Sequence, residues 1–111
     1  LAEGVLTGKY LGGDAPEGSR GSIPRLNVFM RDYLEDEETT SRVQRFVKLA
    51  QKAGLAPAQL ALAFVLRRRE VDTAIVGARI PEQLIENART AGLRVPVDVL
   101  DAVDEIFPAK E

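Results

Sequence analysis

Hydrophobic and polar positions follow a helical period from Glu38 onward. Three hydroxyl residues, Thr39 to Ser41, stand first as candidate N-caps, and Gly54 comes later as a stop. Between them, apolar residues recur three and four positions apart, as on one face of a helix. They are Val43, Phe46, Val47, Leu49 and Ala50. The pattern predicts an amphipathic helix of roughly four turns.

A second helical segment follows Pro57, a residue that the first turn of a helix tolerates. The run AQLALAFVLRR, residues 58–68, is apolar on nearly every side before its arginines. This composition predicts a helix buried around most of its circumference. The run Arg67 to Arg69 is interpreted as a helix C-terminus that interacts favourably with the helix dipole, rather than as a nucleic-acid-binding patch.

The segment VDTAIVGA, residues 71–78, is short, apolar and rich in β-branched residues. It predicts a strand covered on both faces. A strand needs neighbouring strands for its N–H and C=O groups, and the sequence contains no second convincing strand. The helix–strand–helix order therefore predicts the C-terminal part of a larger α/β protein, whose remaining strands lie outside this sequence.

Two further helices are predicted after this strand. Pro81 and Glu82 open the first, PEQLIENARTA, which Gly92 ends. Val95 and Pro96 lead into the second, whose apolar side chains share one face. They are Val99, Leu100, Val103, Ile106 and Phe107. The last helix is therefore predicted to be amphipathic.

Residues 1–37 differ in amino-acid composition from residues 38–111. They contain most of the glycines and are predicted to be loop, with a helical turn around Leu26 to Tyr33. Residues 38–111 carry the predicted helices and strand, and the two parts together form one partial domain over residues 1–111. The acidic run Glu35 to Glu38 between them is interpreted as solvated, and as favourable for the helix N-terminus that follows.

Composition narrows the classes of function. With 111 residues, 45% apolar and a net charge of −2, the chain fits one globular domain without the clustered positive charge of a nucleic-acid-binding protein. It contains no cysteine and no histidine, which excludes disulfides and a conventional zinc site and leaves carboxylates as the possible metal ligands. It has no apolar run of membrane-spanning length and no signal-peptide core. We therefore expect a cytoplasmic protein with no metal, nucleic-acid or membrane partner, and no pattern indicates its oligomeric state.

The sequence GVLTGKY, Gly4 to Tyr10, looks like a nucleoside-triphosphate loop but lacks its spacing. The Walker pattern requires four residues between its glycines and a hydroxyl residue after the lysine. Here only three residues separate Gly4 from Gly8, and Tyr10 follows Lys9. This argues against a nucleoside triphosphatase and leaves a glycine turn.

Four motifs, in order, resemble the C-terminal third of the aldo-keto reductases. They are LAEGVLTGKY at residues 1–10, SR at residues 19–20, PAQLALAFVL at residues 57–66 and AIVGARIPEQLIEN at residues 74–87. The resemblance is closest to the bacterial branch that is also similar to the potassium-channel β subunits. It implies a (β/α)8 TIM barrel, an α/β fold. On that template residues 1–37 follow the seventh strand, residues 71–78 form the eighth strand, and residues 81–91 form the eighth helix.

The family binds NADP(H) in an extended pose, and the resemblance assigns the first motif to its phosphates. Lys9 and Arg20 match basic residues that reach the phosphates. A strip of residues lies along the pyrophosphate in the family, where small side chains let backbone N–H groups approach the oxygens. Its matches here are Leu1, Ala2, Glu3, Gly4 and Leu6.

The resemblance assigns the last motif to the adenosine half of NADP. Gly77 lets the backbone pass close to it, Arg79 lies beside the 2′-phosphate, and Gln83 faces the same phosphate. Glu86 and Asn87 match residues that hydrogen-bond the adenine. Gln83, Glu86 and Asn87 lie three and four positions apart, which predicts one shared helical face. Arg79 and the helix N-terminus would converge on one anion.

The same residues also have ordinary structural interpretations. Lys9 and Arg20 fit solvated loop charges, and Arg79 fits an ion pair with Glu82. The polar face of a surface helix accounts equally for Gln83, Glu86 and Asn87.

The catalytic residues of the family lie outside this sequence. Its tyrosine acid, with lysine, aspartate and usually histidine, comes from the first four strands, so Tyr10 and Tyr33 are not assigned to catalysis. We therefore expect the cofactor-binding segment of an NADP-dependent oxidoreductase acting on a small aldehyde or ketone. In isolation the segment is predicted to be inactive and loosely packed, since an exposed barrel edge is unpaired.

Two other functions stay open. The parent protein also fits a channel-β-like subunit that senses NADP and acts mainly by binding. The chain also fits a self-contained helical interaction module, in which residues 71–78 form a buried connector.

Overall fold

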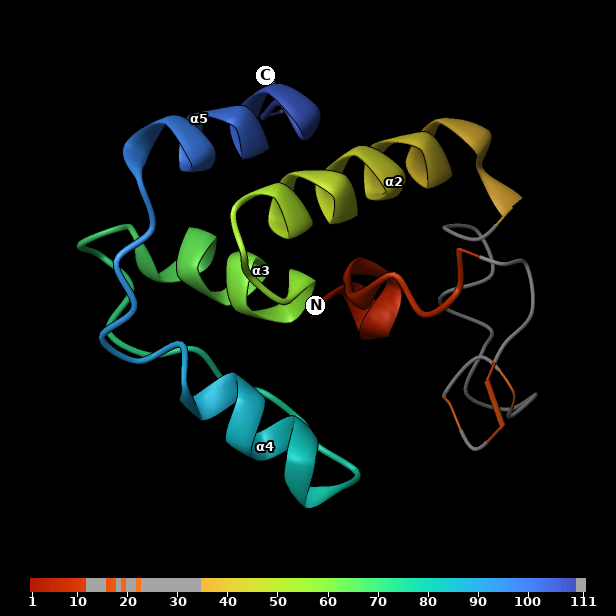
Figure 1. The fold of residues 1–111 in the computed structure, drawn as a ribbon, viewed down its shortest axis with the longest axis horizontal. Coiled ribbons are helices and arrows are strands. Elements are labelled where there is room, and N and C mark those ends of the chain that lie inside the picture. The colour runs from red at the N-terminus through yellow and green to blue at the C-terminus, as the bar shows by residue number, and fades with distance from the viewer. Residues whose placement is uncertain (12–15, 18, 20–21, 23–34, 110–111) are drawn as a thin grey trace.

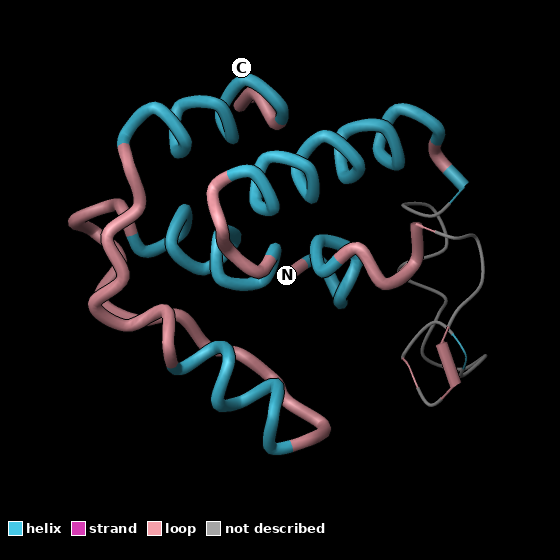
Figure 2. The backbone as a smooth tube through the Cα atoms, viewed as in Figure 1, coloured by secondary structure: helices cyan, strands magenta, loops and turns pink. Residues whose placement is uncertain are grey.

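A computed structural model describes residues 1–11, 16–17, 19, 22 and 35–109. Figure 1 shows a short 3-10 helix, η1, followed by four α-helices, and Figure 2 shows that loops connect them. The bounds are η1 Ala2–Thr7, α2 Glu37–Lys52, α3 Pro57–Leu66, α4 Pro81–Ala88 and α5 Val97–Ile106. The predicted helical turn around Leu26 to Tyr33 lies outside the described residues.

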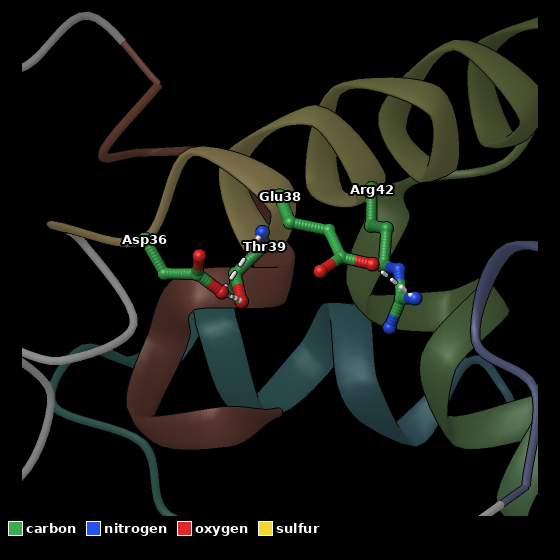
Figure 3. A network of polar contacts seen from close by, with 4 residues as sticks. All are labelled: Asp36, Glu38, Thr39 and Arg42. Atoms are coloured by element: carbon green, nitrogen blue, oxygen red, sulfur yellow. Dashed lines mark hydrogen bonds and ion pairs between the residues drawn. The ribbon is translucent and has the colours of Figure 1, made fainter.

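Helix α2 begins earlier than the hydroxyl residues that the sequence offered as caps. Its N-cap is Asp36, whose Oδ2 accepts a hydrogen bond from the Thr39 N–H at 3.2 Å and another from the Thr39 hydroxyl (Figure 3). One turn further on, Arg42 pairs with Glu38 at 2.6 Å. Asp is a stronger N-cap than Thr, and its negative charge is also favourable at the positive end of the helix dipole, which explains the earlier start.

The turn between α2 and α3 follows the sequence prediction. Gly54 takes a φ of +73°, the left-handed conformation that ends a helix, and Pro57 is the first residue of α3. The Gln59 side chain reaches back to accept a hydrogen bond from the Ala56 N–H at 3.2 Å. These local signals set the sharp change of direction between the two helices, which meet at 94°.

The core lies where α2, α3 and α5 meet. Its buried side chains are Phe46, Ala50, Leu60, Ala61, Val103 and Ile106. Phe107 packs against them and meets the Phe46 ring in an edge-to-face arrangement, at a centroid separation of 6.0 Å. A smaller cluster, formed by Val5, Tyr10 and Val43, fixes η1 against α2. The amphipathic patterns of α2 and α5 are therefore confirmed.

Helix α3 is buried only along its first part. Ala58, Leu60 and Leu62 are buried, whereas Val65 and Leu66 in the last turn are exposed. The prediction of burial around most of the helix was thus correct for its start and wrong for its end. In the part of the chain that the structure describes, no single helix is long and apolar enough to cross a membrane, and α2 and α3 meet that criterion only as a bent pair.

The structure corrects the prediction of a strand at residues 71–78. This segment forms no strand and runs as loop (Figure 2), and its Ile75 is 97% exposed rather than covered. The described residues contain no strand with which it can pair. A β-branched run without a neighbour gains no ladder hydrogen bonds, so its local preference for extended structure has nothing to stabilise it.

Helix α4 stands apart from the core, beyond α3 and away from α5 (Figure 1). It ends at Ala88 rather than at Ala91, and a turn containing Gly92, with a φ of +76°, follows. Around this helix, polar residues are buried and apolar residues are exposed. Asn87 in the helix and Thr90 just after it are buried, whereas Leu84 and Ile85 are 56% and 51% exposed. The apolar side of α4 thus has no cover among the described residues.

Candidate functional site

The first predicted cluster, in η1 and the turn after it, is held by hydrogen bonds to its own backbone. The N–H groups of Gly4 and Leu6 both donate to the Leu1 carbonyl, at 3.0 and 3.3 Å. Leu1 and Leu6 pack their side chains against the core, so this strip is anchored on its apolar side. The two N–H groups that the resemblance directs toward a pyrophosphate are engaged inside the segment in this structure.

Lys9 folds back over Gly4. Gly4 takes a φ of +97°, and a Cβ placed there would lie 2.7 Å from Lys9 Cε and 2.9 Å from Lys9 Nζ. The ammonium lies 5.4 Å from the centroid of the Tyr10 ring, within the range of a cation–π contact. The structure therefore brings Gly4 and Lys9 together, and a side chain at Gly4 would have to displace the end of Lys9.

Sequence reasoning did not single out Thr7, which links these residues. Its hydroxyl donates to the Gly4 carbonyl at 2.6 Å and accepts from the Lys9 N–H at 3.4 Å. A threonine that bonds its neighbouring backbone in this way stabilises a tight turn. Its position between a glycine and a lysine was the available signal.

The second predicted cluster lies at the start of α4. The Gln83 side-chain oxygen accepts a hydrogen bond from the backbone N–H of Arg79 at 2.8 Å. Arg79 is exposed, and its guanidinium forms no ion pair with Glu82 or with any other described residue. An unpaired cation therefore lies beside the positive end of a helix, where an anion would be stabilised by both.

Gly77 precedes this cluster and leaves open space. A Cβ at this residue would meet no atom within 4 Å, and its φ lies outside the left-handed region. Neither packing nor backbone conformation in the described chain requires glycine here. The position can thus accept close approach by a group from outside.

The three polar residues of α4 differ in exposure. Glu86 is exposed and Gln83 half-buried, whereas Asn87 is 8% exposed. Spacing correctly places them on neighbouring positions of the helix surface, but it does not tell which side packs on the body of the protein. Asn87 therefore does not fit the alternative interpretation of these three residues as the polar face of a surface helix.

The two clusters are not adjacent in this structure. Helix α3 contacts both η1 and α4, and no comparable contact joins η1 directly to α4. Arg20, the other predicted phosphate ligand, lies outside the described residues. Among the residues that the structure describes, no group of three carboxylates converges to hold a metal ion.

Comparison with known proteins identifies the family. The family model described as "Aldo/keto reductase family" matches residues 1–107, and the chain belongs to this family. "Protein tas" of Escherichia coli (strain K12) is 38% identical over 106 residues, which are 96% of this chain and 30% of that protein. "Putative voltage-gated potassium channel subunit beta" of Schizosaccharomyces pombe is 37% identical over 110 residues, 96% of this chain and 32% of that protein. The chain spans about a third of the length of the curated relatives it matches.

Proposed function

We propose that this chain is the C-terminal, cofactor-binding segment of a cytoplasmic, NADP(H)-dependent aldo-keto reductase with a (β/α)8 barrel. The observation that carries the proposal is the family match over residues 1–107, together with the guanidinium of Arg79 before α4, which forms no ion pair with any described residue. NADP carries a phosphate that NAD lacks, and a lone arginine beside a helix N-terminus is suited to bind it.

The residues present fit such a cofactor. Arg79 would meet the 2′-phosphate, the open position at Gly77 would admit the adenosine half, and Lys9 would supply charge to the phosphates. The further proposed binding residues are Leu1, Ala2, Glu3, Gly4, Leu6, Arg20, Gln83, Glu86 and Asn87. Asn87 is buried and no contact comparable to those of α3 joins η1 directly to α4, so the proposed site requires α4 to rearrange relative to η1 in the longer protein.

The bound nicotinamide would supply hydride to the carbon of a small carbonyl substrate. The role of this chain is to hold the phosphate and adenosine ends, which fixes the register of an extended cofactor. The general acid and its partners belong to the part of the protein outside this chain, so no residue here is assigned to catalysis.

The exposed apolar surface supports the proposal that this chain is part of a longer protein. Ile75, Ile80, Leu84 and Ile85 are exposed on adjoining parts of the chain, and residues 71–78 lack a strand partner among the described residues. A barrel would bury this surface and would pair this segment with neighbouring strands. Its remaining strands would come from the rest of the longer protein.

Activity measurements test the proposal. The 111-residue chain and the full-length protein are each purified and assayed for consumption of NADPH in the presence of a panel of aldehydes and ketones. We expect turnover by the full-length protein and none by the chain alone. Carbonyl reduction by the isolated chain would contradict the proposal, as would failure of the full-length protein to bind NADPH.

A second function has specific support. The relative from Schizosaccharomyces pombe is named "Putative voltage-gated potassium channel subunit beta". A parent that binds NADPH tightly, lacks the catalytic tyrosine and lysine upstream, and shows no turnover would instead be a cofactor-sensing binding subunit. Cooperative unfolding of the isolated chain as a monomer would favour the helical interaction module.

A further inference from the structure

We propose that Tyr10 is a positioning residue, whose ring holds the ammonium of Lys9 in place for a cofactor phosphate. This inference rests on the proposed function, in which Lys9 supplies charge to the phosphates of NADP(H). Tyr10 is given no contact with the cofactor and no part in catalysis. It acts on binding through Lys9, before the cofactor arrives.

The Tyr10 ring is held by the body of the protein. It is only 6% exposed and packs with Val5 of η1 and Val43 of α2. The turn that carries it is closed by a hydrogen bond from the Leu11 N–H to the Gly8 carbonyl at 3.1 Å. A close-packed side chain on a closed turn has little freedom to change its rotamer. The ring is therefore a firm support for a flexible neighbour.

The Lys9 side chain lies against this support. Its Nζ is 5.4 Å from the centroid of the Tyr10 ring, where the negative face of an aromatic ring attracts a cation. The absence of a side chain at Gly4 makes this position possible, because an added Cβ would lie 2.7 Å from Lys9 Cε. The lysine thus contacts both the Gly4 backbone and the Tyr10 ring.

The charge of Lys9 stays available to an anion. Lys9 is half-buried and forms no ion pair with any described residue. A ring face attracts a cation without neutralising it, so the ammonium can still donate to a phosphate oxygen. A freely rotating lysine loses rotamer freedom when it binds, and one that already lies on a ring loses less. The ring should therefore strengthen cofactor binding only while Lys9 is present.

A double-mutant cycle in the full-length protein tests this dependence. The dissociation constant of NADPH is measured for Tyr10→Leu, Lys9→Met and the double variant. We expect Tyr10→Leu to weaken NADPH binding about two- to fivefold, the change that corresponds to one cation–π contact. In the Lys9→Met background the same substitution should change NADPH affinity by less than about 1.5-fold.

Two further variants separate the role of the ring from the effect of a lost core side chain. Tyr10→Phe keeps the ring and should bind NADPH within about 1.5-fold of the unmodified protein. Phe46→Leu is the matched control, because it removes another buried aromatic ring, from α2. It should leave NADPH affinity unchanged.

NMR of lysine labelled at Cε supplies a second readout that needs no cofactor. The Lys9 signal of the full-length protein is assigned by its loss in Lys9→Met. The aromatic ring should shift the Lys9 ε-protons upfield, and this shift should persist in Tyr10→Phe and disappear in Tyr10→Leu.

Three results would overturn this inference and leave the proposed function intact. The first is an equal NADPH penalty for Tyr10→Leu in both backgrounds, which would make the ring a purely structural element. The second is a Lys9 signal that does not change in Tyr10→Leu, and the third is unchanged NADPH affinity in Lys9→Met. Failure of the unmodified full-length protein to bind NADPH would overturn both.

Discussion

The guanidinium of Arg67, at the C-terminal end of α3, reaches Asp104 of α5 with its Nη2 3.2 Å from the Asp104 Oδ1. The same group lies 3.5 Å from the centroid of the Phe64 ring and donates to the Phe64 carbonyl at 2.5 Å. Arg67 thus satisfies a carbonyl of the last turn and joins two helices that share the core. The interpretation of this arginine as a partner of the helix C-terminus is supported by these contacts.

Replacement of Arg67 is expected to loosen α3 from α5. Arg67→Ala should lower the free energy of unfolding by about 1.5 kcal/mol, because it removes the ring contact and a half-exposed ion pair together. Arg67→Lys should lower the free energy of unfolding by about 1 kcal/mol, since lysine keeps the charge but lacks the planar guanidinium group. Urea titration followed by helical circular dichroism measures both. Arg68→Ala, at an exposed neighbour, is the control and should change stability by less than about 0.5 kcal/mol.

Substitution of Gly4 is predicted to have two separable effects, a loss of stability and a displacement of the Lys9 side chain. Gly4→Ala should cost about 1 kcal/mol through its positive φ, and it should also displace the end of Lys9 from the Tyr10 ring. Gly54→Ala is the matched control, since Gly54 also has a positive φ but no atom within 4 Å of an added Cβ. Urea titration and the NMR shifts of the Tyr10 ring protons separate the two effects. Equal ring shifts in the two variants would contradict the Lys9 arrangement.

The hydroxyl of Thr90 is buried and has no hydrogen-bond partner among the described residues. Thr90→Val removes this polar group at nearly constant volume, so it should raise the stability of the 111-residue chain by about 1 kcal/mol. Thr73→Val, at an exposed position, should be close to neutral. A loss of stability in Thr90→Val, measured by the same titration, would show that the hydroxyl is hydrogen-bonded.

Asp36 is expected to make the start of α2 sensitive to acid. The hydrogen bond from the Thr39 hydroxyl, assisted by backbone N–H groups and by Arg42, holds the pKa of the Asp36 carboxyl below its ordinary value of 3.8. A pKa lowered by folding means that the contribution is present above pH 3.8 and is lost as the pH falls through the folded value. Helical circular dichroism should therefore decrease in this acid range. The decrease should be smaller in Asp36→Asn, which keeps an acceptor without the titration.

The helices were predictable because their signals are local. The three- and four-residue spacing around Phe46 and Val103 needs only one apolar face and one core, and Gly54 and Gly92 mark their turns by their own backbone freedom. The prediction of a strand at residues 71–78 failed, because a strand depends on partners far away in the chain or outside it.

Little of the arrangement of the candidate site could be predicted from the sequence. The family resemblance named Gly4, Lys9, Arg79 and Gln83 as cofactor-binding residues, but it predicted neither the contact of Gly4 with Lys9 nor the hydrogen bond between Arg79 and Gln83. Spacing does not set the rotation of α4 on α3, which buries Asn87. Nor does it set the separation of η1 from α4, because both depend on packing across the whole molecule.

Cofactor selectivity at Arg79 tests the central claim most directly. The dissociation constants of NADPH and NADH are measured for the full-length protein, for Arg79→Ala and for Arg69→Ala, which replaces an exposed arginine after the end of α3. We predict NADPH binding about 10- to 100-fold weaker in Arg79→Ala, because a charge-assisted contact to the 2′-phosphate is lost, with NADH affinity unchanged. Arg69→Ala should bind both cofactors normally. Unchanged NADPH affinity and an unchanged NADPH-to-NADH ratio in Arg79→Ala would contradict the account.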